Sequence, residues 1–319
     1  LIGIALTQSR TAWLALTLLL IGAWIWRGLW SSKRVPWCVT GLFLCFWVLP
    51  TLLKEITNLL LLASEQSYFR DPMQGQLRPL AWRLFLQASM EQLLFGYGWT
   101  DVVHAQLAVA EQFSPLFGTF AQSHNLFLDL VLWLGFPMGL LVSAFLIWQF
   151  VTYYRRVANA KDALLLMFLC VIGIHAMLEL PLHYAYFLLP TGIVMGVLNQ
   201  RTGGTAIFST PRWTVIVLWL CSMTLLALIV VDYFRIEAGF QKVRFELARV
   251  GTLPPGQPLN VVLLDQLPEL INFIRFEPET GMPQKKLAWM EQVTNAYPSG
   301  SSVYKTAKAF ALNGQPEQA

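Results

Sequence analysis

Six long apolar stretches dominate the sequence and limit what it can fold into. At 1.5 Å per residue, each is long enough, or nearly so, to cross the roughly 30 Å hydrocarbon core of a bilayer as a helix. Only helices fit this pattern, because a backbone inside lipid must satisfy its hydrogen bonds internally. The sequence therefore predicts an all-α, polytopic membrane helix bundle. Its six predicted spans are 12–30, 35–53, 126–150, 163–179, 184–200 and 213–231.

The composition agrees with a membrane protein. Of the 319 residues, 56% are hydrophobic and only 13% are charged, whereas about a quarter are charged in a typical soluble domain. The net charge is only +4 and the basic residues lie mainly at helix ends, which argues against a nucleic-acid-binding surface. The cysteines are predicted to pack as small hydrophobic residues, because they lie in apolar runs without metal-ligand spacing. They are Cys38, Cys45, Cys170 and Cys221.

The linkers between the spans alternate in basic content, which predicts the orientation of the bundle. The positive-inside rule places the basic linkers in the cytoplasm. The opposite, outer side then holds the segment before Thr11, the loop 54–123, the link 180–183 and everything after Val231. The basic residues are Lys33 and Arg34, then Arg155, Arg156 and Lys161, then Arg201 and Arg212.

Two regions lie outside the spans. The loop 54–123 is long enough to carry function and contains two predicted helices, one near 77–88 that lies on the membrane and one that begins after Thr100. Residues 232–319 form a predicted helical segment on the same outer side, beginning with an amphipathic helix over 235–249 and ending in a tetratricopeptide-like pattern. The predicted domains are thus 1–231 and 232–319. Because the chain starts mid-pattern without methionine and ends in a helix-like run, we expect a fragment open at both ends.

His124 is the first candidate for chemistry. It lies between a polar segment and the third apolar stretch, with Ser123 as the predicted N-cap and His124 in the first helical turn. There the helix dipole disfavours imidazolium and keeps the ring neutral and able to accept a proton. The sequence therefore predicts a general base, and the alternative is a polar residue that marks the membrane interface.

Arginines are the candidate anion ligands. Arg10 lies at the outer end of the first span, where it can bind phosphate or anchor the interface beside Trp13. Arg78 and Trp82 are four residues apart and share one helix face, whereas Arg83 lies about 140° around from Arg78. Arg78 and Arg83 are therefore not expected to bind one small anion together.

Ionisable residues within or beside the spans are costly and suggest function. Asp129 follows His124, and His175, Glu179 and His183 are spaced four apart near the outer end of the fourth span. The sequence contains no Asp-x-Asp, zinc-protease or phosphate-loop pattern and no serine nucleophile elbow. Chemistry with a metal or another cofactor is therefore not predicted.

These residues together resemble the bacterial O-antigen ligase and polymerase superfamily. The resemblance covers roughly residues 1–200, equivalent to the second half of the family's membrane region. Within it, the stretch 178–187 is similar in particular to the protein O-oligosaccharyltransferase branch. One departure is that Gly135 and Gly139 are one residue further apart than is usual, which affects helix packing more than chemistry. The motifs are Ser9-Arg10-Thr11-Ala12-Trp13, Arg78-x-x-x-Trp82 with Gly96-x-Gly98, His124-Asn125 with Gly135, and Leu178-Glu179-Leu180-Pro181-Leu182-His183-Tyr184-Ala185-Tyr186-Phe187.

The resemblance implies a metal-independent glycosyltransferase in the bacterial inner membrane, with its active site facing the periplasm. The implied reaction moves a glycan from undecaprenyl pyrophosphate to an acceptor hydroxyl, favouring serine or threonine of a protein. His124 would be the base, and Arg10 and Arg78 would stabilise the pyrophosphate leaving group. The residues expected to contribute to substrate binding are Asn125, Arg83, Trp82, Glu179 and His183.

Other functions remain open from the sequence. Within the enzyme class, the acceptor can instead be lipid A core or a growing polysaccharide. A transporter or flippase would use Asp129, Glu179 and His175 along a pathway, but it leaves the arginines of the long loop unexplained. A membrane anchor with a partner-binding tail does not account for the polar cluster on the outer face.

Overall fold

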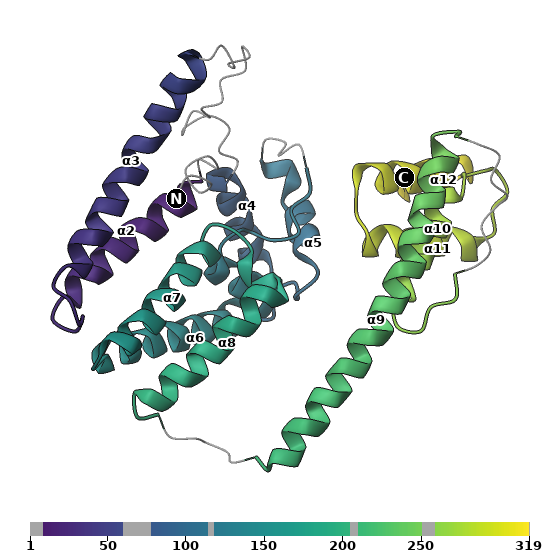
Figure 1. Cartoon of the computed structure of the whole chain (residues 1–319). Helices are drawn as coiled ribbons and strands as arrows, with labels where there is room; N and C mark the ends of the chain where they lie inside the picture. The colour runs from purple at the N-terminus through teal and green to yellow at the C-terminus, as the bar shows by residue number, and fades with distance from the viewer. Residues whose placement is uncertain (1–8, 60–77, 114–117, 205–209, 251–258, 319) are drawn as a thin grey trace. The chain divides into compact units, whose positions relative to one another are not determined.

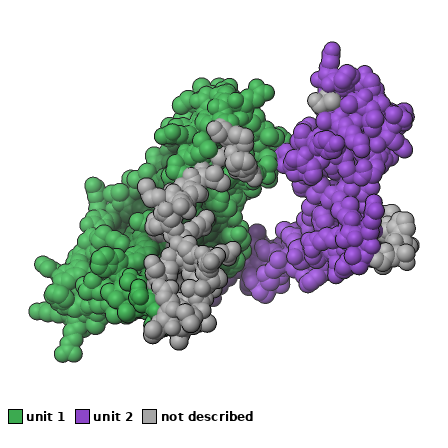
Figure 2. Space-filling view, turned by 90° about the horizontal axis from the view of Figure 1, so that it is seen from above, with its two compact units in different colours: residues 1–206 green, residues 207–319 purple. Residues whose placement is uncertain are grey.

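The computed structural model describes residues 9–59, 78–113, 118–204, 210–250 and 259–318. This part of the chain is helical without strands, which confirms the all-α prediction there (Figure 1). Contacts divide the chain into two compact units, Leu1–Ala206 and Ile207–Ala319 (Figure 2). The first unit contains α2 (Arg10–Ile25), α3 (Val35–Leu59), α4 (Arg78–Glu91), α5 (Val102–Ala108), α6 (Leu126–Arg156), α7 (Ala160–Ala176) and α8 (Ala185–Arg201).

Each predicted span corresponds to a helix. Three of them, α3, α6 and α9 (Arg212–Leu247), are long and apolar enough to cross a membrane, which supports the prediction of a membrane protein. The helices α2, α7 and α8 have 16, 17 and 17 residues and fall short of that length. Crossing of the membrane by all six helices therefore stays a prediction.

Helix α6 is broken at Gly135, and a loop of the chain packs into the break. Gly135 has φ 75° and ψ 172°, which is far from helical and accessible to glycine. The break frees backbone groups that bond to residues 93–98: Tyr97 N–H donates to Leu132 O at 2.6 Å and Phe136 N–H donates to Leu93 O at 2.8 Å. The predicted periplasmic loop is thereby joined to α6 through its backbone.

The same junction explains two glycines of the loop. Gly96 and Gly98 have φ of 64° and 93°, and Gly98 N–H donates to Trp133 O at 3.2 Å. A Cβ at Gly96 would lie 2.4 Å from Leu132 O, so no side chain fits there. Helix α4 ends shortly before these glycines, at Glu91.

Helix α4 packs along the first half of α6 instead of standing alone. A core forms between α4, α5 and the start of α6, with Phe85 and Leu132 fully buried. The buried face of α4 has the three-to-four spacing expected of an amphipathic helix. Its members are Ala81, Leu84, Phe85, Ala88 and Ser89. This packing positions Arg78 and Trp82 next to the N-terminal end of α6.

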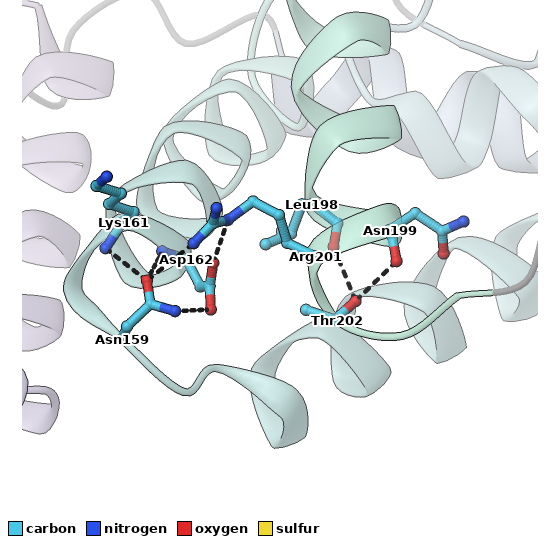
Figure 3. Close-up of polar contacts among 7 residues, drawn as sticks. All are labelled: Asn159, Lys161, Asp162, Leu198, Asn199, Arg201 and Thr202. Atoms are coloured by element: carbon cyan, nitrogen blue, oxygen red, sulfur yellow. Dashed lines mark hydrogen bonds and ion pairs between the residues drawn. The ribbon is translucent and has the colours of Figure 1, made fainter.

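A polar cluster joins the N-terminal end of α7 to the C-terminal end of α8 (Figure 3). The buried carboxylate of Asp162, in the first turn of α7, accepts from Arg201 Nε at 2.5 Å. Asn159 caps α7 and donates to Asp162 at 2.7 Å, and Arg201 also donates to Asn159 at 3.1 Å. Arg156, at the end of α6, donates to Thr202 O at 3.1 Å. The basic ends of these three helices thus lie together, away from His124 at the start of α6.

The second unit contains α9, α10 (Gln266–Arg275), α11 (Gln284–Ala296) and α12 (Gly300–Leu312). The amphipathic helix predicted for 235–249 is not separate, because α9 continues through it without a break. Helices α11 and α12 pack around Met290 and Phe310, and α12 covers part of the segment with the tetratricopeptide-like pattern, whose assignment stays a prediction. The predicted domain boundary after residue 231 follows membrane topology and stays a prediction, whereas the contacts place α9 with the C-terminal helices.

Candidate active site

The segment that carries His124 is fixed on both sides. Trp82 Nε1, from α4, donates to Ser123 O at 2.9 Å, so this tryptophan supports the segment through its backbone. Ser123 is buried, and its N–H donates to Asp129 Oδ1 at 2.7 Å. Asp129 therefore reaches back from the first turn of α6 to hold the residue before His124. Trp82 was expected to bind substrate, and here its indole N–H positions the loop.

Asn125, and not Ser123, caps helix α6. The side-chain oxygen of Asn125 accepts from Phe127 N–H at 3.1 Å and from Leu128 N–H at 3.2 Å. The predicted N-cap was wrong by two residues, because asparagine is at least as good a cap as serine and the Ser123 hydroxyl instead accepts from Asn125 N–H at 3.2 Å. His124 thus lies before the helix, outside its first turn. Asn125 was expected to bind substrate, but its side-chain oxygen accepts hydrogen bonds from the backbone of the helix.

His124 adopts an uncommon backbone conformation. Its φ is 59°, in the left-handed region that costs a non-glycine residue roughly 1–2 kcal/mol. The fixed neighbours on both sides hold it there, and Phe120 packs edge-on against its ring with centroids 5.9 Å apart. Backbone strain of this kind concentrates at functional sites, where the surrounding structure maintains it.

Glu179 lies between Arg78 and His124. It follows the end of α7, where its N–H donates to His175 O at 2.8 Å. Its Oε1 forms an ion pair with Arg78, and its Oε2 lies 3.8 Å from Nδ1 of His124. The side chains of Arg78, Glu179 and His124 are 33%, 38% and 26% exposed, so all three are partly open. Three separate segments thus bring a base, an acid and a guanidinium together.

The pKa of His124 is lowered from the ordinary value near 6.5, which favours the neutral ring at pH 7. Burial is the largest cause and Arg78 acts in the same direction, whereas Glu179 and Asp129 raise the pKa. The direction agrees with the prediction, although His124 lies outside the helical turn on which that prediction rested. Nδ1 of His124 is buried and has no hydrogen-bond partner among the described residues.

The other predicted site residues differ in their surroundings. Arg10 begins α2, but its side chain lies outside what the structure describes. Arg83 is exposed on α4 and forms no ion pair with any described residue. His183 lies in a short 3-10 turn, Pro181–His183, and its Nδ1 hydrogen-bonds Gln122 Nε2 at 2.7 Å. His175 packs edge-on against Phe187 with ring centroids 5.7 Å apart.

Within the described ranges, no three histidine, cysteine, aspartate or glutamate side chains gather closely enough to hold an ion. Two loop carboxylates, Glu65 and Asp71, lie outside those ranges. Independence from metal therefore stays a prediction.

Sequence reasoning missed several side chains next to this site. In the sequence Gln122 is only part of the polar segment before His124, and none of the motifs includes Trp99 or Trp133. Trp99 stacks on Trp133 with ring centroids 4.4 Å apart. No regular spacing connects a loop residue that follows Gly98 with a residue inside α6, so only the break at Gly135 and its bonds to the loop reveal this contact.

Two family profiles match the chain. One, described as O-Antigen ligase, matches residues 1–143, and the other, described as Virulence factor membrane-bound polymerase, C-terminal, matches residues 163–319. Together they leave only a short central stretch unmatched.

Two curated relatives from Acinetobacter baylyi are also similar. The ComP-specific O-oligosaccharyltransferase is 32% identical over 199 residues, which are 61% of this chain and 35% of that protein. The General O-oligosaccharyltransferase is 27% identical over 337 aligned positions, which are 99% of this chain and 56% of that protein. The chain thus spans between about a third and just over half of the length of these relatives. No solved structure matched the chain.

Proposed function

The chain belongs to the O-antigen ligase and polymerase superfamily and is similar to its O-oligosaccharyltransferase branch, and from this premise we propose a function. We propose that it transfers a glycan from an undecaprenyl-pyrophosphate carrier to an acceptor hydroxyl. The observation that carries the proposal is the placement of Glu179 between the guanidinium of Arg78 and the imidazole of His124. One group can hold a leaving pyrophosphate and the other can accept a proton.

Arg78 would stabilise the charge that develops on the leaving group. A guanidinium has five N–H donors in a planar fork that suits phosphate oxygens. Glu179 occupies one end of this fork, and the structure gives Arg78 no other partner among the described residues. The remaining donors can meet a phosphate oxygen as the sugar–phosphate bond breaks. Arg10 is proposed as the second phosphate ligand on the strength of the family resemblance.

His124 would act as the general base. The carboxylate of Glu179 faces Nδ1, which favours the tautomer that carries its proton there and leaves a lone pair on Nε2. The acceptor hydroxyl would give its proton to Nε2 while its oxygen bonds to the anomeric carbon of the sugar. The bond from that carbon to the phosphate oxygen breaks, and the pyrophosphate leaves with the electron pair. Glu179 is thus a positioning residue for both neighbours.

The distance of 3.8 Å between Glu179 and His124 is longer than a hydrogen bond. Donor binding offers a reason for it to shorten, because a pyrophosphate that binds the remaining donors of Arg78 would weaken the ion pair between Arg78 and Glu179. A carboxylate that is released from the guanidinium can move toward Nδ1, which lacks a partner among the described residues. Catalytic hydrogen bonds often tighten only in the substrate complex.

The proposed location is the periplasmic face of the bacterial inner membrane. Support comes from the separation of the two polar clusters along the helices: His124 precedes α6, whereas Arg156 ends α6 near the Asp162–Arg201 pair. The positive-inside rule places that basic end in the cytoplasm.

The proposed acceptor is a serine or threonine hydroxyl of a protein, because both relatives from Acinetobacter baylyi are named O-oligosaccharyltransferases. A lipid A core acceptor or polysaccharide polymerisation is the second candidate, and the two family descriptions favour it. A transport function receives less support. Asp129, one of its pathway residues, is buried and bonded to the backbone of Ser123.

Replacing the proposed base tests the function. His124→Ala should lower the rate of glycan transfer by about 10²-fold or more in membranes that contain normal amounts of protein. His104→Ala is a matched control, because His104 belongs to the same loop and also has a carboxylate partner, Asp101 Oδ1 at 3.5 Å. Transfer by the control should stay near the wild-type rate. Normal transfer by His124→Ala would contradict the proposed role.

A further inference from the structure

Next to the candidate active site lies a cluster that the proposed proton transfer does not use. It consists of Trp99, Trp133, His183 and Gln122, and we refer to it as the Trp99 cluster. The ring of Trp99 stacks on Trp133 with centroids 4.4 Å apart and planes inclined by 22°. His183 lies 5.7 Å from the ring of Trp133 and 6.1 Å from that of Trp99, and Gln122 bonds to His183.

The two tryptophans differ in exposure. Trp133 is only 7% exposed, whereas Trp99 is 67% exposed. Trp133 therefore packs against one face of the Trp99 ring, and the other face of that ring stays exposed. The backbone also holds this arrangement, since Gly98 N–H donates to Trp133 O at 3.2 Å. A preformed aromatic face is suited to binding, because little ordering is needed when a ligand stacks on it.

The cluster also contains unsatisfied polar atoms. Within the described part of the chain, Trp133 Nε1 and Gln122 Oε1 are buried and have no hydrogen-bond partner. One is a donor and the other an acceptor. Buried polar groups in proteins almost always have a partner, so these two atoms indicate that a polar ligand completes the cluster. Two residues after Gln122, His124 Nδ1 is unsatisfied in the same way.

We propose that the Trp99 cluster binds a sugar ring of the donor glycan. A pyranose offers hydroxyl groups that both donate and accept hydrogen bonds, together with an apolar face that stacks on an indole. The proposal rests on the proposed function. It further places the bound ring near the pyrophosphate end of the glycan, because Gln122 and His124 belong to the same fixed segment as Ser123.

Tryptophans at a membrane interface provide the main competing explanation. Interface anchoring accounts for the exposure of Trp99. It does not account for a buried Trp133 whose N–H lacks a partner among the described residues, or for the edge-on contact of His183 with Trp133. The two explanations differ in what they predict for ligands with and without a sugar.

Binding to two lipids tests the proposal. The complete protein in nanodiscs is titrated with the lipid-linked glycan extracted from its native membranes and, separately, with bare undecaprenyl pyrophosphate. Trp99→Ala should weaken binding of the glycan-bearing lipid by roughly 5- to 10-fold, as expected for the loss of one aromatic contact. Its affinity for the bare lipid should stay unchanged. Trp99→Phe, which keeps an aromatic face, should retain most of the preference for the glycan-bearing lipid over the bare lipid.

A matched control separates stacking on sugar from anchoring in the membrane. Trp37, on α3, is also 67% exposed and packs against another tryptophan, Trp24, with centroids 5.1 Å apart. Trp37→Ala should change neither affinity. An equal loss for both lipids in Trp99→Ala, or no loss for either, would overturn the sugar subsite.

The same assay distinguishes this inference from the proposed function. Arg78→Lys should weaken binding of both lipids, because the pyrophosphate is common to them. If Arg78→Lys weakens the binding of both lipids and Trp99→Ala changes the binding of neither, the sugar subsite is wrong and the pyrophosphate site stands. If the wild type binds neither lipid, both the proposed function and the subsite are contradicted.

Discussion

At the scale of single residues, Glu179 connects the two groups on which the proposed chemistry depends. Its carboxylate meets Arg78 through one oxygen and faces His124 Nδ1 through the other, at 3.8 Å. His124 has a lowered pKa, in which burial and Arg78 oppose Glu179 and Asp129. The charges on Arg78, Glu179 and Asp129 therefore affect the protonation of the proposed base.

The dependence of transfer on pH should report His124. A base acts in its neutral form, and its pKa lies below 6.5, so kcat/KM should be level near pH 7 and fall as the pH decreases through the lowered pKa. Glu179→Gln removes a charge that raises this pKa, so the acid limb should move to lower pH. Profiles of kcat/KM against pH, for the wild type and for Glu179→Gln, measure both the acid limb and its shift. An acid limb that moves to higher pH in Glu179→Gln would contradict the arrangement.

Lysine in place of Arg78 separates charge from geometry. Arg78→Lys keeps the positive charge that lowers the His124 pKa, so the acid limb should stay in place. The planar fork is lost, and transfer should decrease by about 10-fold or more. Steady-state kinetics with the lipid-linked glycan as the varied substrate measure the change. A wild-type rate would show that the site requires only a point charge.

At the scale of elements, the break in α6 positions the site. Residues 93–98 bond to the carbonyl and amide groups that the break frees, and the same region of α6 packs against α4. Trp99 and Trp133 meet because of this junction. A regular helix through residue 135 would pair Leu132 O with Phe136 N–H and leave the loop without these bonds, and only Trp133 O would lack a partner, because Pro137 has no N–H.

Alanine at Gly135 tests the junction. Its φ of 75° disfavours any side chain, and a Cβ would lie 2.4 Å from Leu94 O. Gly135→Ala should therefore destabilise the protein by about 2 kcal/mol or more and lower its Tm in detergent. Gly41→Ala is the control, because Gly41 lies in α3 with no atom within 4 Å of its Cβ position. Equal Tm values for the two variants would show that the junction contributes little to stability.

At the scale of the whole molecule, membrane orientation can be tested at two exposed positions of the first unit. Ala121 lies near His124, and Arg155 lies at the other end of α6. With the four native cysteines replaced by serine, Ala121→Cys should react with an impermeant maleimide added from the periplasm. Arg155→Cys should react only after the inner membrane is opened. Labelling of both positions from one side would contradict the predicted topology.

The class of the protein follows from its local sequence. The apolar stretches predicted helices, since hydrocarbon would leave the backbone few alternatives, and helices lie at all six positions. The motifs identified the family, and the family profiles agree with it. Local spacing also separated Arg78 from Arg83 on their helix. All of these features depend on residues close together in the chain.

The contacts between side chains that are far apart in the chain are seen only in the tertiary structure. Asn125 replaces Ser123 as the cap because Asp129 and Trp82 hold Ser123 through its backbone. Glu179 is 101 residues from Arg78 in the chain, and no periodic pattern specifies that contact. Trp99 reaches Trp133 because α6 breaks and exposes backbone groups that the loop satisfies. Such contacts depend on packing between distant elements, to which hydropathy and helical periodicity are not sensitive.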